Sequence, residues 1–175
     1  VFNHSAEKDA AEPIAEITPT GVRTTDGVDH DVDVIVYATG FHANRYLWPM
    51  DIVGRDATVL AEQWGETPTA YLGIAVPRFT NLIVMYRRGT NLATGGSMIF
   101  HAECQIRNIM GCLGQLIARG GGTMEVRQDV HDDYNDRLQA ELDQFVWTHP
   151  SIRHSWYRAD DGRIYILSPW RLVDY

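Results

Sequence analysis

The segment from Leu82 to Leu116 contains the residues best suited to bind a ligand. An apolar run typical of a strand, Leu82–Tyr86, leads into the loop Gly89-Thr-Asn-Leu-Ala-Thr-Gly-Gly96, and a helix is predicted to begin beside Ser97. Backbone N–H groups at a helix start favour an anion or an electron-rich carbonyl, and glycines let a flat ligand approach the backbone. The same pattern also fits an ordinary strand-to-helix loop, and spacing alone does not decide between the two.

A second candidate site follows the run Asp33-Val-Ile-Val-Tyr-Ala-Thr-Gly-Phe41, where Thr39 and Gly40 end a predicted strand. Ligands of open α/β sheets bind at the carboxyl ends of strands. A glycine at the end of a strand is also common in proteins that bind nothing there, so this pair is a weak signal by itself.

Other kinds of chemistry find little support. The sequence contains no Gly-x-Gly-x-x-Gly for a nucleotide phosphate and no Gly-x-Ser-x-Gly elbow of a hydrolase. Its seven histidines and two cysteines do not form two pairs with zinc-ligand spacing, so no metal site is predicted. Asp132 and Asp133 lie near a predicted helix start, where the helix dipole explains them without a catalytic role.

The N-terminal part is predicted to be β-structure. Ile14–Ile17 and Val22–Thr24 flank one turn, and Asp26-Gly27 marks a second. Val32–Tyr37 is predicted to be a strand covered on both faces, because its interior residues are all apolar.

The remainder alternates strands and helices. Strands are predicted at Leu72–Val76 and Leu82–Tyr86, with short helical segments near Tyr46 and Val59. The strongest helix runs from an N-cap at Ser97 to Arg119, where three glycines stop it. Apolar residues recur along it at steps of three and four, as in a helix: Ile99, Ala102, Ile106, Ile109, Leu113 and Leu116.

A second amphipathic helix is predicted from about Asp129 to Trp147, after a short strand at Thr123–Arg127. The residues expected to be buried on this helix are Val130, Tyr134, Leu138, Leu142 and Phe145. The tail is predicted to be a β-hairpin of Ser155–Arg158 and Ile164–Leu167 around Asp160-Asp161-Gly162.

Composition and charge limit the binding partners and the cellular compartment that we expect for this protein. The 175 residues carry a formal net charge of −8 with no basic block, which argues against nucleic acid or an anionic membrane as partner. No apolar run reaches the roughly 18 residues of a membrane span. Residues 1–12 are polar, and we expect a mobile lead-in without a signal peptide. Cys104 and Cys112, about 12 Å apart along one helix, cannot pair with each other, which favours a reduced, cytoplasmic protein.

A set of short motifs, in this order, resembles the C-terminal region of flavin-dependent Baeyer–Villiger monooxygenases. The tail narrows the resemblance to the 4-hydroxyacetophenone monooxygenase branch. The match covers about residues 13–175, and the combination is more specific than any single motif. The motifs are Asp33-Val-Ile-Val-Tyr-Ala-Thr-Gly-Phe, Gly54-Arg-Asp, Glu62-Gln-Trp, Ala70-Tyr-Leu-Gly-Ile, Phe79-Thr-Asn-Leu, Gly89-Thr-Asn-Leu through Gln105, Ser155-Trp-Tyr and Ser168-Pro-Trp-Arg-Leu-Val-Asp-Tyr.

The resemblance implies an α/β fragment of a two-dinucleotide-binding, Rossmann-type flavoprotein with a β-hairpin tail. Residues 13–43 would close the NADPH-binding domain, and residues 44–175 would be the C-terminal part of the FAD-binding domain. The family uses FAD, NADPH and O₂ to insert an oxygen atom beside a ketone carbonyl, which gives an ester or lactone. The implied cofactor-binding residues are Thr39, Gly40, Asn91, Leu92 and Ser97, with Asn91 and Leu92 near the pyrimidine edge of the flavin and Ser97 at the helix dipole.

The resemblance also implies what this segment lacks. The family's two phosphate-binding motifs, its fingerprint motif and its active-site arginine belong upstream, so no catalytic residue is assigned and the segment alone is expected to be inactive. Relatives usually carry Gly-Pro where Arg87-Arg88 follows Tyr86, a change that would rebuild the loop or impair flavin binding. Two alternatives stay open: a non-enzymatic remnant that acts as an interaction or dimerisation module, and a flavin monooxygenase that oxygenates nitrogen or sulfur.

Overall fold

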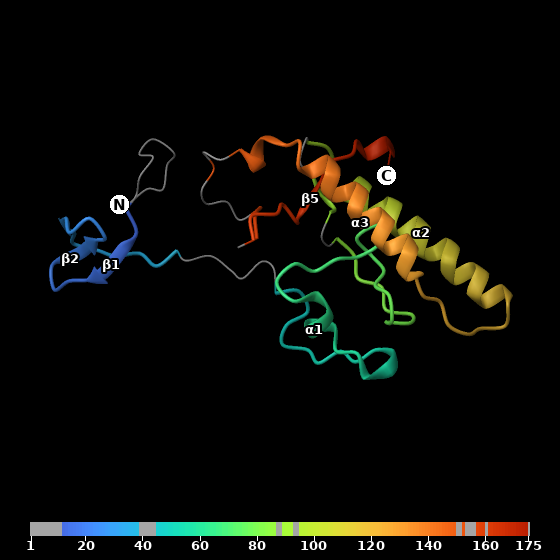
Figure 1. Cartoon of the computed structure of the whole chain (residues 1–175). Coiled ribbons are helices and arrows are strands. Elements are labelled where there is room, and N and C mark those ends of the chain that lie inside the picture. The colour runs from blue at the N-terminus through green and yellow to red at the C-terminus, as the bar shows by residue number, and fades with distance from the viewer. Residues whose placement is uncertain are drawn as a thin grey trace. The chain divides into compact units, whose positions relative to one another are not determined.

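The computed structural model describes residues 12–38, 45–86, 89–92, 95–149, 152, 157–159 and 161–174. The chain divides into two compact units, Val1–Phe41 and His42–Tyr175, each taken by itself below (Figure 1). The predicted lead-in at residues 1–12, apart from its last residue, lies outside the described residues. In chain order the elements are β1 (Ile14–Ile17), β2 (Gly21–Thr24), β3 (Asp29–Asp31), the 3₁₀ helix η1 (Arg55–Ala57), α1 (Leu60–Trp64), β4 (Asn91–Leu92), α2 (Met98–Ala118), α3 (Gln128–Leu142), the 3₁₀ helix η2 (Val146–Thr148), β5 (Leu167–Ser168) and the 3₁₀ helix η3 (Leu172–Asp174).

The first unit is a three-stranded antiparallel sheet in the order β1-β2-β3. The two predicted turns are confirmed. Thr18 and Gly21 exchange backbone hydrogen bonds in the first, and in the second the Asp26 carboxylate accepts from the backbone N–H of Val28 at 3.1 Å. Gly21 is required by the close approach of β3, because a Cβ there would lie 1.9 Å from the carbonyl oxygen of His30.

The predicted strand Val32–Tyr37 is wrong for this structure. The third strand is Asp29–Asp31 instead, and the following apolar residues are in no strand. Val34 is 72% exposed and Val36 80% exposed. A strand requires a ladder of backbone pairs, whereas the single backbone hydrogen bond recorded for this segment runs from the Val32 N–H to the Thr20 carbonyl at 3.0 Å. Its apolar character alone therefore does not make it a strand.

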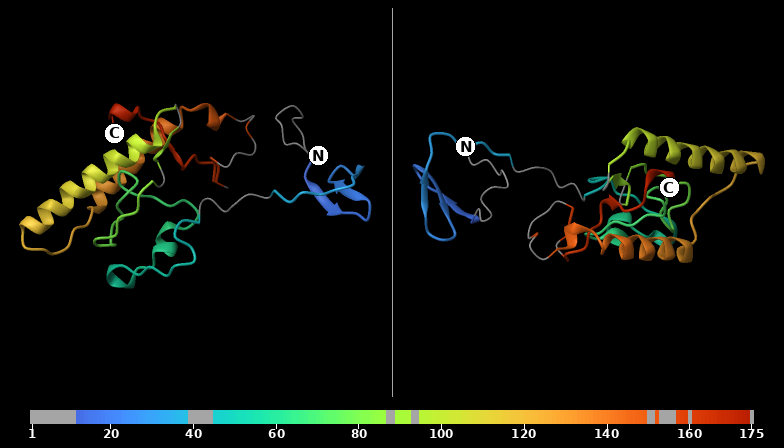
Figure 2. Two further views of the ribbon diagram at one scale, coloured as in Figure 1. Left: turned by 180° about the vertical axis from the view of Figure 1, so that it is seen from behind. Right: turned by 90° about the horizontal axis from the view of Figure 1, so that it is seen from above.

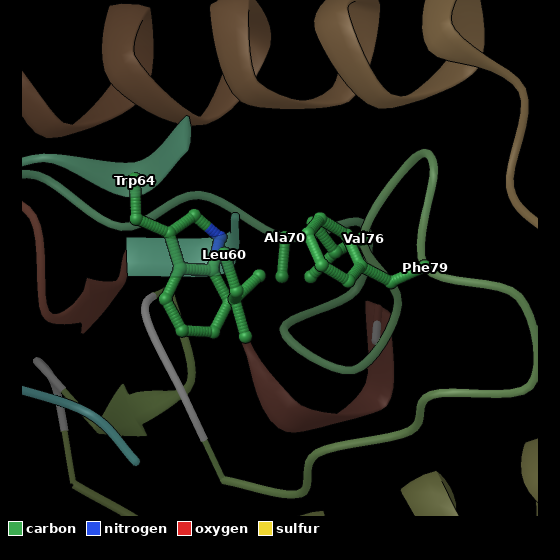
Figure 3. Close-up of a cluster of buried hydrophobic side chains, with 5 residues drawn as sticks. All are labelled: Leu60, Trp64, Ala70, Val76 and Phe79. Carbon is green, nitrogen blue, oxygen red and sulfur yellow. The ribbon is translucent and has the colours of Figure 1, made fainter. Parts of the chain in front are cut away.

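The second unit is built on two clusters of buried side chains. The first surrounds α1 and is shown in Figure 3; it comprises Leu60, Trp64, Ala70, Val76 and Phe79. The second joins α3 to the C-terminal tail and comprises Tyr134, Leu138, Leu142, Ile164 and Leu167. Burial of Tyr134, Leu138 and Leu142 confirms most of the predicted inner face of α3, although Val130 is exposed and the helix ends at Leu142 rather than Trp147.

The helix α2 has the predicted bounds. Ser97 caps it, and Gly120, at φ +85°, begins the glycine run after its end, where the N–H of Gly121 bonds to the carbonyl of Leu116. The right-hand view of Figure 2 shows α2 and α3 on opposite sides of a layer of turns and short strands. In the part of the chain that the structure describes, no helix is long and apolar enough to cross a membrane.

The apolar repeat of α2 is covered only in part, since Ala102, Ile109, Leu113 and Leu116 are half-buried. Ile99 is 72% exposed and Ile106 47% exposed, while the buried residues of the helix are the polar His101 and Gln105. Periodicity located the helix correctly, but it does not show which neighbours cover each side.

Three predicted strands are also absent. Leu72–Val76 forms a turn closed by an isolated antiparallel bridge of Tyr71 with Ala75, and an isolated bridge of Ala75 with Ile83 joins it to the run Leu82–Tyr86. Leu72, at the start of the first run, and Tyr86, at the end of the second, have left-handed backbone with φ near +50°, which is incompatible with extended structure at these two positions. Thr123–Arg127 is irregular and is held by other contacts, such as the hydrogen bond of 2.9 Å from the Asn81 N–H to the Met124 carbonyl.

The tail reverses direction where the hairpin was predicted. Arg158 and Ile164 form an antiparallel bridge, and the Gly162 N–H closes the turn on the Ala159 carbonyl at 2.8 Å. Residues 153–156 and 160 lie outside the described residues. Beyond the turn, β5 pairs in parallel with β4, which brings the tail against the glycine-rich loop.

Candidate functional site

The predicted ligand loop begins beside the buried strand β5. Gly89 and Asn91 donate backbone hydrogen bonds to the same carbonyl, that of Ile166, at 3.1 and 3.2 Å. Gly89 has φ +74°, and a Cβ there would lie 2.7 Å from Leu138 Cδ2. Only glycine therefore fits this position without moving the core, and the loop starts from a fixed point.

The other end of the loop is the start of α2. The Ser97 hydroxyl accepts a hydrogen bond from the backbone N–H of Phe100 at 3.2 Å, so the predicted N-cap is confirmed. The neighbouring N–H groups of the first turn have no intrahelical acceptor and retain the positive end of the helix dipole. Residues 95–100 are exposed, whereas His101 in the first turn is buried, so a ligand can approach the start of the helix from the side of the loop.

The C-terminal tail packs against the loop at Gly96. Gly96 has φ +127°, and a Cβ there would lie 2.6 Å from Leu172 Cδ1 in η3. The same Cβ would lie 3.6 Å from Leu92 Cδ1, so the side chains of Leu92 and Leu172 both reach this glycine. Sequence reasoning did not single out Leu172, which lies about 75 residues beyond the loop and shares no pattern with it.

One buried amide joins α2 to the segment before the loop. The Gln105 side chain is fully buried; its Oε1 accepts from the backbone N–H of Tyr86 at 3.0 Å and its Nε2 donates to the carbonyl of Leu72 at 3.4 Å. The Tyr86 hydroxyl in turn lies 3.2 Å from Asn91 Oδ1. Burial raises the pKa of the Tyr86 hydroxyl, so it stays protonated and can donate.

The structure describes three of the five predicted cofactor-binding residues. Asn91, Leu92 and Ser97 belong to one strand–loop–helix unit, in which Asn91 and Leu92 are half-buried and Ser97 is exposed. Thr39 and Gly40 lie outside the described residues, as do Arg87 and Arg88. The role of these five positions in cofactor binding stays a prediction.

Other titratable groups show structural roles. Burial lowers the pKa of His101, whose ring packs edge-on against the ring of Tyr86 with centroids 6.4 Å apart. The hydrogen bond from His131 lowers the pKa of Asp132, and Asp133 forms an ion pair with Arg137 at 3.4 Å. Among the described residues, no group of three or more histidine, cysteine or acidic side chains could hold a metal ion.

The fold is that of part of a two-cofactor flavoprotein. The structure of this chain superposes on that of OTEMO in complex with FAD and NADP with a TM-score of 0.74 at 24% identity, covering 93% of this chain and 30% of that one. It superposes on oxidized steroid monooxygenase bound to NADP with a TM-score of 0.70 at 27% identity, covering 91% of this chain and 30% of that one. The chain therefore has the α/β fold of a segment of FAD- and NADP-binding Baeyer–Villiger monooxygenases.

Sequence comparison gives relatives of the same class. The chain is 35% identical over 162 residues to an uncharacterized monooxygenase, y4iD, of Sinorhizobium fredii, covering 92% of this chain and 24% of the relative. It is 33% identical over 164 residues to a Baeyer–Villiger monooxygenase of Pseudomonas aeruginosa, covering 91% and 31%. No family model matches the chain. The chain thus spans less than a third of the length of each of these relatives.

Proposed function

We propose that this chain is the C-terminal part of an FAD- and NADPH-dependent Baeyer–Villiger monooxygenase, in which it forms one wall of the flavin site. The unit from β4 through the loop to the N-terminus of α2 carries this proposal. It combines close-packed glycines, an exposed helix start and a fold shared with solved complexes of FAD and NADP. In this assignment residues 13–43 belong to the NADPH-binding domain and residues 44–175 to the FAD-binding domain, and Thr39 and Gly40 contribute to cofactor binding.

The residues at the loop fit a flavin. The first-turn N–H groups of α2 are donors for the carbonyl-rich edge of the ring system, and the helix dipole favours negative charge there. The exposed side chains of Met98, Ile99 and Phe100 offer apolar surface beside these donors. When bound, FAD reduced by NADPH supplies the activation of O₂; the residues of this chain hold and polarise the ring but perform no assigned chemical step.

For the substrate we propose an aryl ketone, which the enzyme would convert to an ester. The support is the resemblance of the tail to the 4-hydroxyacetophenone branch. In the structure Trp170 of this tail packs against Tyr134, with ring centroids 5.3 Å apart. This tryptophan therefore belongs to the packing around the second cluster of buried side chains. A panel of aryl ketones, cyclic ketones, amines and sulfides, with product analysis, would separate ketone oxygenation from the nitrogen- or sulfur-oxygenating alternative.

The direct test is an FAD titration, followed by flavin fluorescence, of the complete product of the gene that encodes this chain. Saturable binding of FAD, with NADPH-dependent conversion of an aryl ketone to its ester, is expected. We expect the 175-residue chain alone to show no such conversion, because its sequence contains no Gly-x-Gly-x-x-Gly turn for either dinucleotide. Ketone oxidation by the isolated chain would refute that part, and a complete gene product that binds no FAD would refute the main proposal.

The alternative is an interaction or dimerisation module. It is favoured by exposed apolar side chains on α2, such as Ile99 and Ile117, which suit contact with another copy in a homo-oligomer. We also propose a cytoplasmic location, because Cys104 and Cys112 are both free thiols. Fluorescence microscopy of the tagged gene product would test the location.

A further inference from the structure

Gln105 connects two strained points of the backbone. Two residues that its side chain contacts, Leu72 and Tyr86, are non-glycine residues with left-handed backbone, at φ +50° and +52°. Such conformations are unfavourable for residues with a Cβ and persist only where the surroundings hold them. Here a fully buried amide on α2 satisfies one backbone group at each point, so the helix fixes the path of the chain as it approaches the loop.

Tyr86 connects this fixed segment of backbone to Asn91 in the loop. Its ring is held edge-on by the buried His101, and its hydroxyl donates to Asn91 Oδ1 at 3.2 Å. Because a carboxamide has an oxygen end and a nitrogen end, engaging the oxygen sets which way the group is turned. The structure records no partner for Asn91 Nδ2 among the residues it describes, so this nitrogen is the end left to donate to a ligand.

We propose that Tyr86 and Gln105 are positioning residues for Asn91: together they hold its amide with Nδ2 turned toward a carbonyl acceptor on the ring of a bound FAD. This inference rests on the proposed function, since it concerns the same loop. It adds two residues that the sequence patterns did not single out. Neither touches the ligand; each acts through Asn91, Tyr86 by its hydroxyl and Gln105 by accepting the hydrogen bond from the backbone N–H of Tyr86.

Tyr86→Phe in the complete gene product tests the proposal, because it removes only the hydroxyl and keeps the ring against His101. We expect the FAD dissociation constant to rise about threefold to tenfold, the effect of one hydrogen bond. The midpoint potential of the bound flavin should become more negative, because its ring loses a donor. Tyr71→Phe is the matched control: Tyr71 is half-buried, packs on Tyr134, and has no recorded hydroxyl partner in the described part of the chain.

A double-mutant cycle separates positioning from a general effect on structure. Asn91→Ala should weaken FAD binding at least as much as Tyr86→Phe, and the double variant should bind FAD no more weakly than Asn91→Ala alone. Gln105→Met removes the amide hydrogen bonds to Tyr86 and Leu72 at similar side-chain length and should weaken FAD binding further through the backbone of Tyr86. If Gln105→Met does not fold, the cycle of Tyr86 and Asn91 still decides the question.

The outcomes distinguish this inference from the function on which it rests. Wild-type protein that binds no FAD overturns both. Wild-type protein that binds FAD, with Tyr86→Phe indistinguishable from wild type or with fully additive losses in the cycle, overturns the positioning role and leaves the proposed function standing. An equal loss in Tyr71→Phe would likewise overturn it, since the effect would then not depend on Asn91.

Discussion

Ser97 connects the glycine-rich loop to α2 through one side-chain hydrogen bond, to the backbone N–H of Phe100. We expect Ser97→Ala to lower the free energy of unfolding by about 1 kcal/mol, because that donor at the helix start loses its acceptor. Urea denaturation followed by circular dichroism would measure this loss. Ser97→Asp is the matched control, since it restores an acceptor and adds charge that suits the helix dipole; if it is as unstable as Ser97→Ala, the cap is not the source of the effect.

His101 predicts a pH dependence of stability. Burial lowers its pKa below the usual value of about 6.5, so between the two values the unfolded chain binds more protons than the folded one. Its contribution is complete above the unfolded pKa and is lost as the pH falls below it, with a slope of at most about 1.4 kcal/mol per pH unit. Between pH 7.5 and 5, the unfolding free energy of the wild type should fall more steeply with decreasing pH than that of His101→Phe.

The control for this prediction is Ile109→Val, a change on the same helix that adds and removes no titratable group. It should lower stability by a similar amount at every pH. Equal slopes for wild type and His101→Phe would show that this histidine does not titrate on unfolding.

At the residue scale, the sequence predicted the local features and missed the distant ones. The cap at Ser97 and the turn at Asp26-Gly27 depend on neighbours within a few positions, and both are confirmed. The buried role of Gln105 depends on Leu72 and Tyr86, 33 and 19 residues away, which no local pattern reveals. Contacts between residues so far apart in the sequence cannot be predicted from short motifs, so this part of the candidate site was not predicted.

At the scale of elements, α2 carries a line of exposed apolar side chains. Ile99, Ile106, Met110 and Ile117 are 72%, 47%, 60% and 75% exposed, and their spacing of seven, four and seven residues places them along one side of the helix. We expect any self-association of the chain to bury this stripe, because removing each isoleucine from water would contribute up to about 1.5 to 3 kcal/mol.

We therefore expect the isolated 175-residue chain to self-associate, and Ile106→Lys with Ile117→Lys to reduce that association. Each substitution places a charge in the stripe, which makes its burial costly. Sedimentation velocity over a range of concentrations would measure the change. Gln115→Lys, an exposed position on another side of α2, adds a charge outside the stripe and should leave association unchanged. A wild-type chain that is monomeric throughout would refute the prediction.

The elements also show why strand predictions failed where helix predictions succeeded. The helices α2 and α3 follow from the spacing of residues within each segment and from the groups at their ends. The run Val32–Tyr37 is as apolar as a buried strand, yet a strand requires a partner that the segment cannot supply. At Leu72 and Tyr86, positive φ angles turn the chain out of extended structure, and nothing in these residue types signals it.

At the scale of the whole molecule, the two units differ in how much core they hold. Both clusters of buried side chains lie in His42–Tyr175, whereas Val22 is the single buried large apolar residue among the described residues of Val1–Phe41. A small sheet with so little buried apolar surface is marginal by itself. The second unit should therefore carry the cooperative unfolding of the chain.

We expect residues 42–175, produced without the first unit, to unfold at the same midpoint temperature as the whole chain. Residues 12–38, as a peptide, should show no cooperative transition, because one buried valine does not offset the entropy of ordering three strands. Calorimetry of the three samples would measure this, and for a chain of this size a shift of about 4 °C corresponds to about 1 kcal/mol. A larger fall in the midpoint of residues 42–175 would mean that the first unit stabilises the second. A cooperative transition in the peptide would mean that the salt bridges of Arg23 with Glu16 and Asp29, rather than an apolar core, hold the sheet.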